Sequence, residues 1–223
     1  MFCGKIAHAL SEFLIVVGQA RPVDYTQKEI DFLNNKVANV YLNLAVKYMY
    51  QDQWPRVIDY TLMYLAHKSD SLKGQRLLAF AYASNKQYDL AETYYNKCLA
   101  ASPDNYALRA DFAYMLESMG NFSKAYGEIK QASHTAPSVT ALYVDRAWMA
   151  ETCKDYAAAL ISINAAIDQS PNSPGLWIHK GRILVALGKY GEAKQVLDRA
   201  LQLEPDSIEA KLSLKQIPQN VKP

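Results

Sequence analysis

Apolar side chains recur along most of the chain at helical spacing, and this pattern itself repeats every 34 residues. Four prolines set the period: Pro103, Pro137, Pro171 and Pro205. With this proline as position 32 of a repeat, position 8 is always small: Ala45, Ala79, Ala113, Ala147 and Gly181. Position 17 is always aromatic: Trp54, Tyr88, Phe122, Tyr156 and Tyr190. Position 20 is Val57, Ala91, Ala125, Ala159 and Ala193. This periodicity predicts four clear repeats and a fifth, degenerate one.

Each repeat is predicted to fold as two helices joined by a short turn. In the last repeat the helices span Gly175–Leu187 and Tyr190–Leu203, and Pro205 closes the repeat because proline cannot continue a helix. The small residue at position 8 faces position 20 and lets the two backbones approach closely. Because one pair cannot bury its apolar face alone, stacked pairs supply the core. The predicted repeats are 38–71, 72–105, 106–139, 140–173 and 174–205.

The repeat resembles the tetratricopeptide repeat, whose 34-residue pattern has Trp, Leu, Gly, Tyr, Ala, Phe and Pro at set places. The last repeat matches this pattern at Trp177, Gly181, Leu184, Tyr190, Ala193, Leu197, Ala200 and Pro205. Repeat 38–71 is degenerate, with Val57 in place of alanine and Ser69 in place of proline. The resemblance implies an all-α, right-handed α-solenoid of helix-turn-helix repeats, whose first helices line a concave groove.

Two segments lie outside the predicted array. Residues 1–37 are expected to form an N-terminal helical extension, with an amphipathic helix around residues 6–17 and a second helix at Tyr25–Asn35. Residues 206–223 are expected to supply a capping helix and a frayed tail. This helix spans about Ser207–Gln216, and Asp206 with Glu209 resembles a capping box at its start.

The role of residues 1–20 stays open between three interpretations. The apolar face of Ile6, Leu10, Phe13, Leu14 and Val17 suits a helix that packs on the first repeat as a cap. The same face suits a helix that docks on a partner or on a second copy. A signal peptide is the third interpretation, although Glu12 and His8 interrupt the apolar stretch that such a signal requires.

Composition narrows the class of protein. The 223 residues include 50% hydrophobic residues and carry a formal net charge of +2, so neither wholesale disorder nor a nucleic-acid partner is indicated. Three widely spaced cysteines do not form a disulfide framework, and Cys98 and Cys153 are expected to be small buried apolar residues. No sequence motif for nucleotide binding, metal binding or hydrolysis is present, so we expect neither enzymatic activity nor a cofactor.

The candidate binding residues lie on the predicted first helices. Position 9 of successive repeats forms an aromatic ladder with a basic end: Phe80, Tyr114, Trp148 and Arg182. Carboxylates accompany the middle repeats: Asp111, Asp145, Glu117 and Glu151. Arg76 lies toward one end. Such a groove suits a peptide or helix with large apolar anchors and some Lys or Arg. The alternative is that the rings are partly buried packing residues and that the carboxylates are a solvated surface.

The resemblance implies a non-catalytic protein–protein interaction scaffold or chaperone, expected in the cytoplasm. If residues 1–20 are a signal, the protein is instead exported or periplasmic. One subclass of the family grips a C-terminal carboxylate with Lys, Asn and Arg, but Arg76, Phe80 and Asp111 hold those places here. Two other uses remain open. One is a self-assembling adaptor in which the N-terminal helix fills the groove of another copy, and the other is a bacterial secretion or pilus assembly factor.

Overall fold

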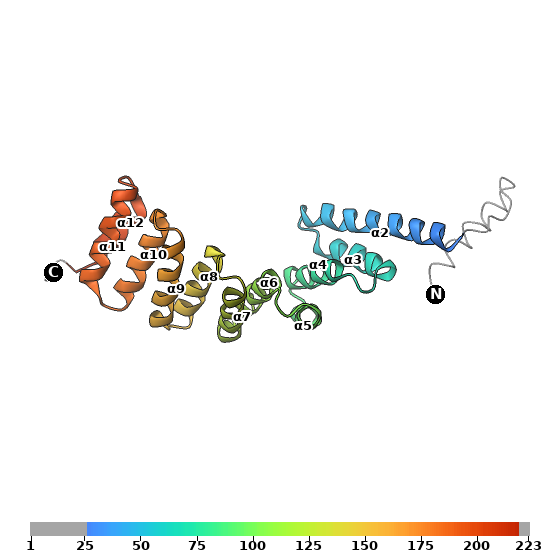
Figure 1. Cartoon of the computed structure of the whole chain (residues 1–223), viewed down its shortest axis with the longest axis horizontal. Coiled ribbons are helices and arrows are strands. Elements are labelled where there is room, and N and C mark those ends of the chain that lie inside the picture. Colours follow the sequence, from blue (N-terminus) through green and yellow to red (C-terminus); the bar gives the residue numbers. More distant parts are fainter. Residues whose placement is uncertain (1–25, 219–223) are drawn as a thin grey trace. The chain divides into compact units, whose positions relative to one another are not determined.

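The computed structural model describes residues 26–218, and every regular element within them is a helix. The eleven helices of this part of the chain are α2 (Gln27–Met49), α3 (Trp54–His67), α4 (Leu72–Ser84), α5 (Tyr88–Ala101), α6 (Tyr106–Ser118), α7 (Phe122–Thr135), α8 (Thr140–Thr152), α9 (Tyr156–Gln169), α10 (Pro174–Ala186), α11 (Tyr190–Leu203) and α12 (Ile208–Lys215). The predicted all-α solenoid class is confirmed, since consecutive helices pack in pairs and, within each of the two modules described next, each pair packs on its neighbour (Figure 1).

The helices fall into two compact modules that divide between Ala101 and Ser102. The N-terminal module holds α2 to α5 and the C-terminal module holds α6 to α12. Each module is described by itself below. The core of the C-terminal module includes a cluster around Ile163 and Ile183, and a second cluster where Leu197 and Ala210 join α11 to α12.

Local sequence sets the ends of the helices. Several begin at a side chain that caps the first turn by accepting a hydrogen bond from a backbone N–H: Thr26, Ser71, Asn105, Asn121, Asp155 and Ser207. The turn inside each pair has one residue with positive φ at the same position of the period: Asp52, Lys86, Gly120, Lys154 and Gly188. Glycine adopts a positive φ without steric cost, so Gly120 and Gly188 fit this position of the turn better than Asp52, Lys86 and Lys154 do.

Burial of the small residues agrees with closely packed helix pairs. At position 8 the alanines and Gly181 are all buried, and the five residues at position 20 have no exposed surface. A Cβ atom built on Gly181 would lie 2.6 Å from Cγ and Cδ2 of Leu197, so this glycine meets position 24 of the repeat rather than the predicted position 20. The side chain of Leu197 on α11 therefore leaves no room for a Cβ atom at Gly181 on α10.

We expect Gly181→Ala to lower the free energy of unfolding by about 1–2 kcal/mol, because overpacking against Leu197 outweighs the gain in helix propensity. Gly127→Ala is the matched control, since a Cβ atom there meets nothing within 4 Å and the substitution should stabilise α7 by about 1 kcal/mol. Urea unfolding followed by circular dichroism measures both. A Gly181→Ala protein as stable as the wild type would contradict this account of the packing.

Two predicted helix boundaries were wrong, one near each end of the described residues. The second helix predicted to end at Asn35 does not stop there, because α2 runs without a break from Gln27 to Met49. Residues Asn34 to Val37 contain neither proline nor glycine, so nothing interrupts the helix. At the other end, Ser207 rather than Asp206 caps α12, and its Oγ accepts from the N–H of Ala210. Glu209 is then one residue too early to close a capping box.

Two further expectations have different outcomes. Cys98 is buried, as predicted, and burial raises the pKa of its thiol. The prediction for Cys153 was wrong, because this residue follows α8 at the start of an exposed turn. The helix predicted around residues 6–17, the signal-peptide interpretation of residues 1–20 and most of the C-terminal tail lie outside the described residues.

Candidate functional site

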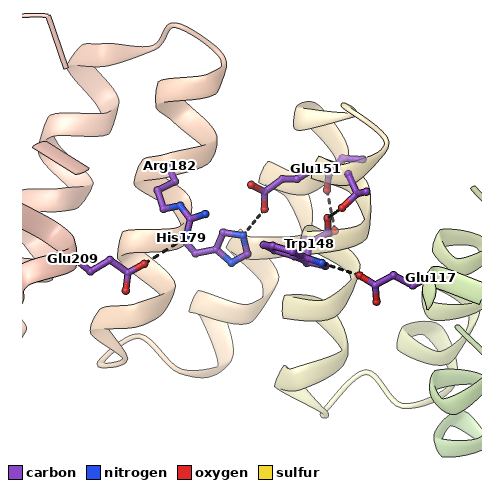
Figure 2. A network of polar contacts seen from close by, with 9 residues as sticks. Glu117, Trp148, Glu151, His179, Arg182 and Glu209 are labelled. Carbon is purple, nitrogen blue, oxygen red and sulfur yellow. Dashed lines mark hydrogen bonds and ion pairs between the residues drawn. The ribbon is translucent and has the colours of Figure 1, made fainter. Parts of the chain in front are cut away.

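The first helices of the pairs in the C-terminal module carry a row of polar and aromatic side chains that reach from one helix to the next. These helices are α6, α8 and α10, and α12 takes the next place in the row. Figure 2 shows the part of this row that runs from Glu117 to Glu209. We call the row of Tyr114, Asp145, Trp148, Glu117, Glu151, His179, Arg182 and Glu209 the polar ladder.

The first contacts of the polar ladder join α6 to α8 in both directions. The phenol of Tyr114 on α6 donates a hydrogen bond to the carboxylate of Asp145 on α8. In return, Trp148 on α8 donates from Nε1 to Oε1 of Glu117 on α6, over 3.0 Å (Figure 2). Each ring is thus fixed at its polar edge while much of it stays open, with 43% of Tyr114 and 50% of Trp148 exposed.

The remaining contacts continue the row toward the C-terminus. His179 on α10 contacts the carboxylate of Glu151 on α8, and both side chains are largely buried. Arg182, one turn further along α10, pairs with Glu209 on α12 over 3.4 Å (Figure 2). The Arg182 pair is well exposed and contributes little to stability.

The electrostatics of the site follow from its carboxylates. Burial and the hydrogen bond to Asp145 raise the pKa of Tyr114, and the charges of Asp145, Glu117 and Asp111 act in the same direction. Burial also raises the pKa of Asp145, and Glu117 adds to that rise, whereas the hydrogen bond from Tyr114 opposes it. The rings of the polar ladder therefore lie in a negatively charged environment.

The raised pKa of Asp145 predicts a pH dependence of stability. A carboxyl whose pKa is higher in the folded protein stabilises the fold below its unfolded pKa of about 3.9, and this contribution is lost as the pH rises through the folded value. We therefore expect Asp145→Asn to gain stability relative to the wild type as the pH rises from 3.5 to 7, measured by urea unfolding.

Tyr114→Phe is the matched test of the cause of this shift. It removes the hydrogen bond that lowers the pKa of Asp145, so the carboxyl should titrate at still higher pH. An Asp145→Asn protein whose stability difference from the wild type does not change with pH would contradict the prediction.

The structure brings together most of the predicted site residues. Tyr114, Trp148, Asp145, Glu117, Glu151 and Arg182 all belong to the polar ladder, and Asp111 lies half-buried on α6. Arg76 and Phe80 lie on α4 in the N-terminal module. There the exposed ring of Phe80 meets Trp54 edge to face, with the centroids 5.6 Å apart. Phe80 therefore packs against Trp54 with part of its ring and exposes the rest.

Sequence reasoning missed two connections in the polar ladder. His179 occupies position 6 of its repeat, where the two preceding repeats have Asp111 and Asp145. This replacement of an aspartate by a histidine was the signal in the sequence that could have predicted the contact with Glu151. Glu209 was assigned to a cap, although it lies 27 residues after Arg182 at the start of the next helix in the row. In residues 26–218 no group of three or more His, Cys, Asp or Glu side chains is placed to hold a metal ion.

Paired helices that recur every 34 residues, with exposed aromatic side chains on the first helix of successive pairs, define a helical-repeat protein. The particular family is shown by the sequence model of the tetratricopeptide repeat, which matches residues 82–144 and 154–217. These ranges cover more than half of the chain, and the chain belongs to the tetratricopeptide repeat family. No curated protein matches the chain.

Solved structures of the same family have a similar fold. MamA from Desulfovibrio magneticus is 17% identical, with 76% of this chain and 97% of that chain covered and a TM-score of 0.66. YrrB is 18% identical, with 86% and 100% covered and a TM-score of 0.67. PilF of Pseudomonas aeruginosa is 18% identical, with 81% and 82% covered and a TM-score of 0.63. At these identities the likeness is one of fold.

Membrane spanning was tested on the helices of residues 26–218, and none of them combines the length and the apolar character that a crossing requires.

Proposed function

We propose that this protein is a non-catalytic interaction scaffold or chaperone that binds a partner peptide or helix on the polar ladder of the C-terminal module. The observation that carries the proposal is Trp148, a large ring that is half exposed although its indole N–H is bonded to Glu117. Hot spots of protein interfaces are enriched in tryptophan, tyrosine and arginine. The family supports this class of function, because its members are generally interaction scaffolds without catalytic activity.

The rings of Trp148 and Tyr114 are preorganised for binding, because hydrogen bonds within the protein fix their orientation. A hydrogen bond at the polar edge of each ring reduces its freedom before any partner arrives, so binding costs less side-chain entropy. Covering the open half of a tryptophan removes about 100 Å² from water, which is worth about 2–3 kcal/mol. A partner with large apolar side chains would gain this free energy at both rings.

The charge around the rings selects among apolar partners. Glu117 and Asp145 each accept a hydrogen bond from a ring and raise the pKa of neighbouring groups, so their negative charge is incompletely compensated. A Lys or Arg of the partner placed between these carboxylates would relieve their repulsion and lie close to an aromatic face. We therefore propose a partner segment with apolar anchors and Lys or Arg side chains.

Known relatives support peptide binding as a use of this fold. YrrB is described as a tetratricopeptide repeat protein with an unusual peptide-binding site.

We place the protein in the cytoplasm without a cofactor or nucleic-acid partner. The domain organisation of 1–37, 38–205 and 206–223 is also part of this proposal. The self-assembling adaptor and the secretion or pilus assembly factor stay predictions.

Affinity capture from the native cell tests the proposed function. The immobilised wild-type chain should retain a discrete partner, and the double variant Glu117→Gln with Glu151→Gln should retain much less of it. Glutamine keeps an oxygen acceptor for the Trp148 N–H and removes only the charge. Asp198→Asn on α11 is the matched control, since this carboxylate is exposed on a second helix.

The capture should also weaken when the salt is raised from about 50 to 300 mM, because ions screen exposed charges. A partner retained equally by all three proteins, or the lack of any discrete partner, would contradict the proposal.

A further inference from the structure

The N-terminal half of α2 carries apolar side chains that the described part of the chain leaves exposed. No residue from Gln27 to Val37 is buried, and burial on this helix begins at Ala38. Leu33 is 41% exposed, Val37 39% and Val40 55%. Figure 1 shows this end of α2 reaching past α3. The first turns of α2 thus lack the packing that holds the rest of the helix on the module.

With the half-buried Ile30 and Leu44, these exposed side chains form a regular stripe. Ile30, Leu33, Val37, Val40 and Leu44 follow one another at intervals of three, four, three and four residues. This is the spacing of a helix face that packs along one other helix. We call these five residues the α2 stripe.

The α2 stripe is separate from the face that packs on α3. Ala38, Leu42 and Ala45 form the buried face, and Ala38 and Leu42 cluster with Tyr64 of α3. Continued toward the N-terminus at helical spacing, the buried face meets Asn34, Asp31 and Gln27, which are polar. The α2 stripe stays apolar where the buried face becomes polar, so it is suited to a different occupant.

A helix end of this kind needs a partner to be stable. Isolated helical turns are marginal in water, and most helical stability comes from packing of an apolar face. The start of α2 is nevertheless well specified, because Thr26 and Glu29 form a reciprocal capping box. The helix α2 thus begins at a defined residue, and the apolar face of its first turns is not covered by any residue in 26–218. These two observations point to a segment that binds there.

We propose that the α2 stripe binds residues 6–20 of the same chain as an antiparallel helix. Ile6, Leu10, Phe13 and Val17 are spaced at four, three and four residues, and Ala20 continues the series. Paired antiparallel, the two stripes match layer by layer: Ala20 with Ile30, Val17 with Leu33, Phe13 with Val37, Leu10 with Val40, and Ile6 with Leu44. Every layer of this register is apolar.

The connection between the two helices also fits. Residues 21–25 join them, which is within the usual length for a helical hairpin, and Pro22 prevents the first helix from continuing into the second. Lys5, His8, Ser11 and Glu12 would face solvent. A connection this short gives a local concentration in the millimolar range, which favours the segment of the same chain over a second copy.

This pairing gives the N-terminal segment a role in the array. The hairpin closes the N-terminal end of the stacked pairs, where a solenoid otherwise exposes apolar surface. Residues 6–20 are then occupied within their own chain and are not free to fill the binding face of another copy or to be removed as a signal. The inference does not depend on the polar ladder, so it can fail without affecting the proposed function.

Disulfide trapping tests the register. In a Cys3→Ser, Cys153→Ser background, Leu10→Cys and Val40→Cys form the test pair, and buried Cys98 is kept. His8→Cys with Val40→Cys is the control, because His8 lies on the opposite face of the predicted helix. Under mild oxidation at low protein concentration we expect the test pair to cross-link within the monomer about tenfold faster than the control. Equal rates would overturn the register, and cross-linked dimers would show that a second copy occupies the α2 stripe.

Hydrogen exchange on chains without engineered cysteines provides the second measurement. Deleting residues 2–20 should speed exchange of the amides in residues 27–40 by about tenfold or more and leave α4 and α5 unchanged. Unchanged exchange in residues 27–40 would overturn the proposal even if the cysteine variants failed to fold.

Discussion

Replacing both Trp148 and Tyr114 with alanine is expected to weaken binding of the partner by about 1,000-fold. Each ring is held at its polar edge and exposes its face, so each truncation removes a prepared apolar contact. Interface hot spots of this kind cost about 2 kcal/mol or more each when truncated to alanine. Isothermal titration with the captured partner measures the change in dissociation constant.

The control for this prediction is the double variant Tyr106→Ala with Ile161→Ala. These exposed apolar side chains lie at the start of α6 and on the second helix α9, outside the polar ladder. Both double variants should keep the helical content of the wild type, because none of the four side chains is buried. If the Trp148 and Tyr114 variant binds the partner as tightly as the control does, these rings are packing residues and the proposed site is wrong.

Phe112→Ala is expected to give the largest loss of stability, about 3–5 kcal/mol. Phe112 lies on α6, and only 1% of its surface is exposed. Truncation leaves a cavity the size of a ring in a helix that packs closely on α7, and such cavities collapse only partly. Urea unfolding of the C-terminal module, followed by circular dichroism, measures the effect.

Tyr106→Ala on the same helix is the matched control for Phe112→Ala, since it also removes a ring but from an exposed position. We expect this change to cost less than about 0.5 kcal/mol. Because stability in a repeat array is a sum of local terms, Phe112→Ala should speed hydrogen exchange most in α6 and α7. A loss of less than 1 kcal/mol would show that α6 is not packed as described.

The stacking of helices could be predicted from the sequence because it depends on local spacing. Positions 8 and 20 of each repeat are buried within a pair, so 34-residue periodicity was enough to locate them. The helices predicted at Gly175–Leu187 and Tyr190–Leu203 are observed as Pro174–Ala186 and Tyr190–Leu203. Pro174 in the first turn of α10 and the positive φ of Gly188 between the two helices are also local signals.

The contacts of the site could be predicted only in part. Position 9 placed Tyr114 and Trp148 on first helices, but their hydrogen bonds join residues 31 positions apart in the chain. Such bonds depend on the rotamer of each side chain and on the offset between neighbouring pairs, which periodicity does not specify. Glu209 shows the same limit. The cap of α12 is Ser207, one residue later than predicted, and Glu209 pairs with Arg182 instead of closing a capping box.

Oxidative footprinting of side chains, with and without the captured partner, tests the central claim most directly. Hydroxyl radicals label exposed rings, so a partner bound on the polar ladder should protect Trp148 and Tyr114 while Tyr106 and Ile161 keep their labelling. This account predicts that most of the labelling of Trp148 is lost in the complex. Unchanged labelling of Trp148, with protection of Ile161 or Tyr106 instead, would show that the partner binds elsewhere on the protein.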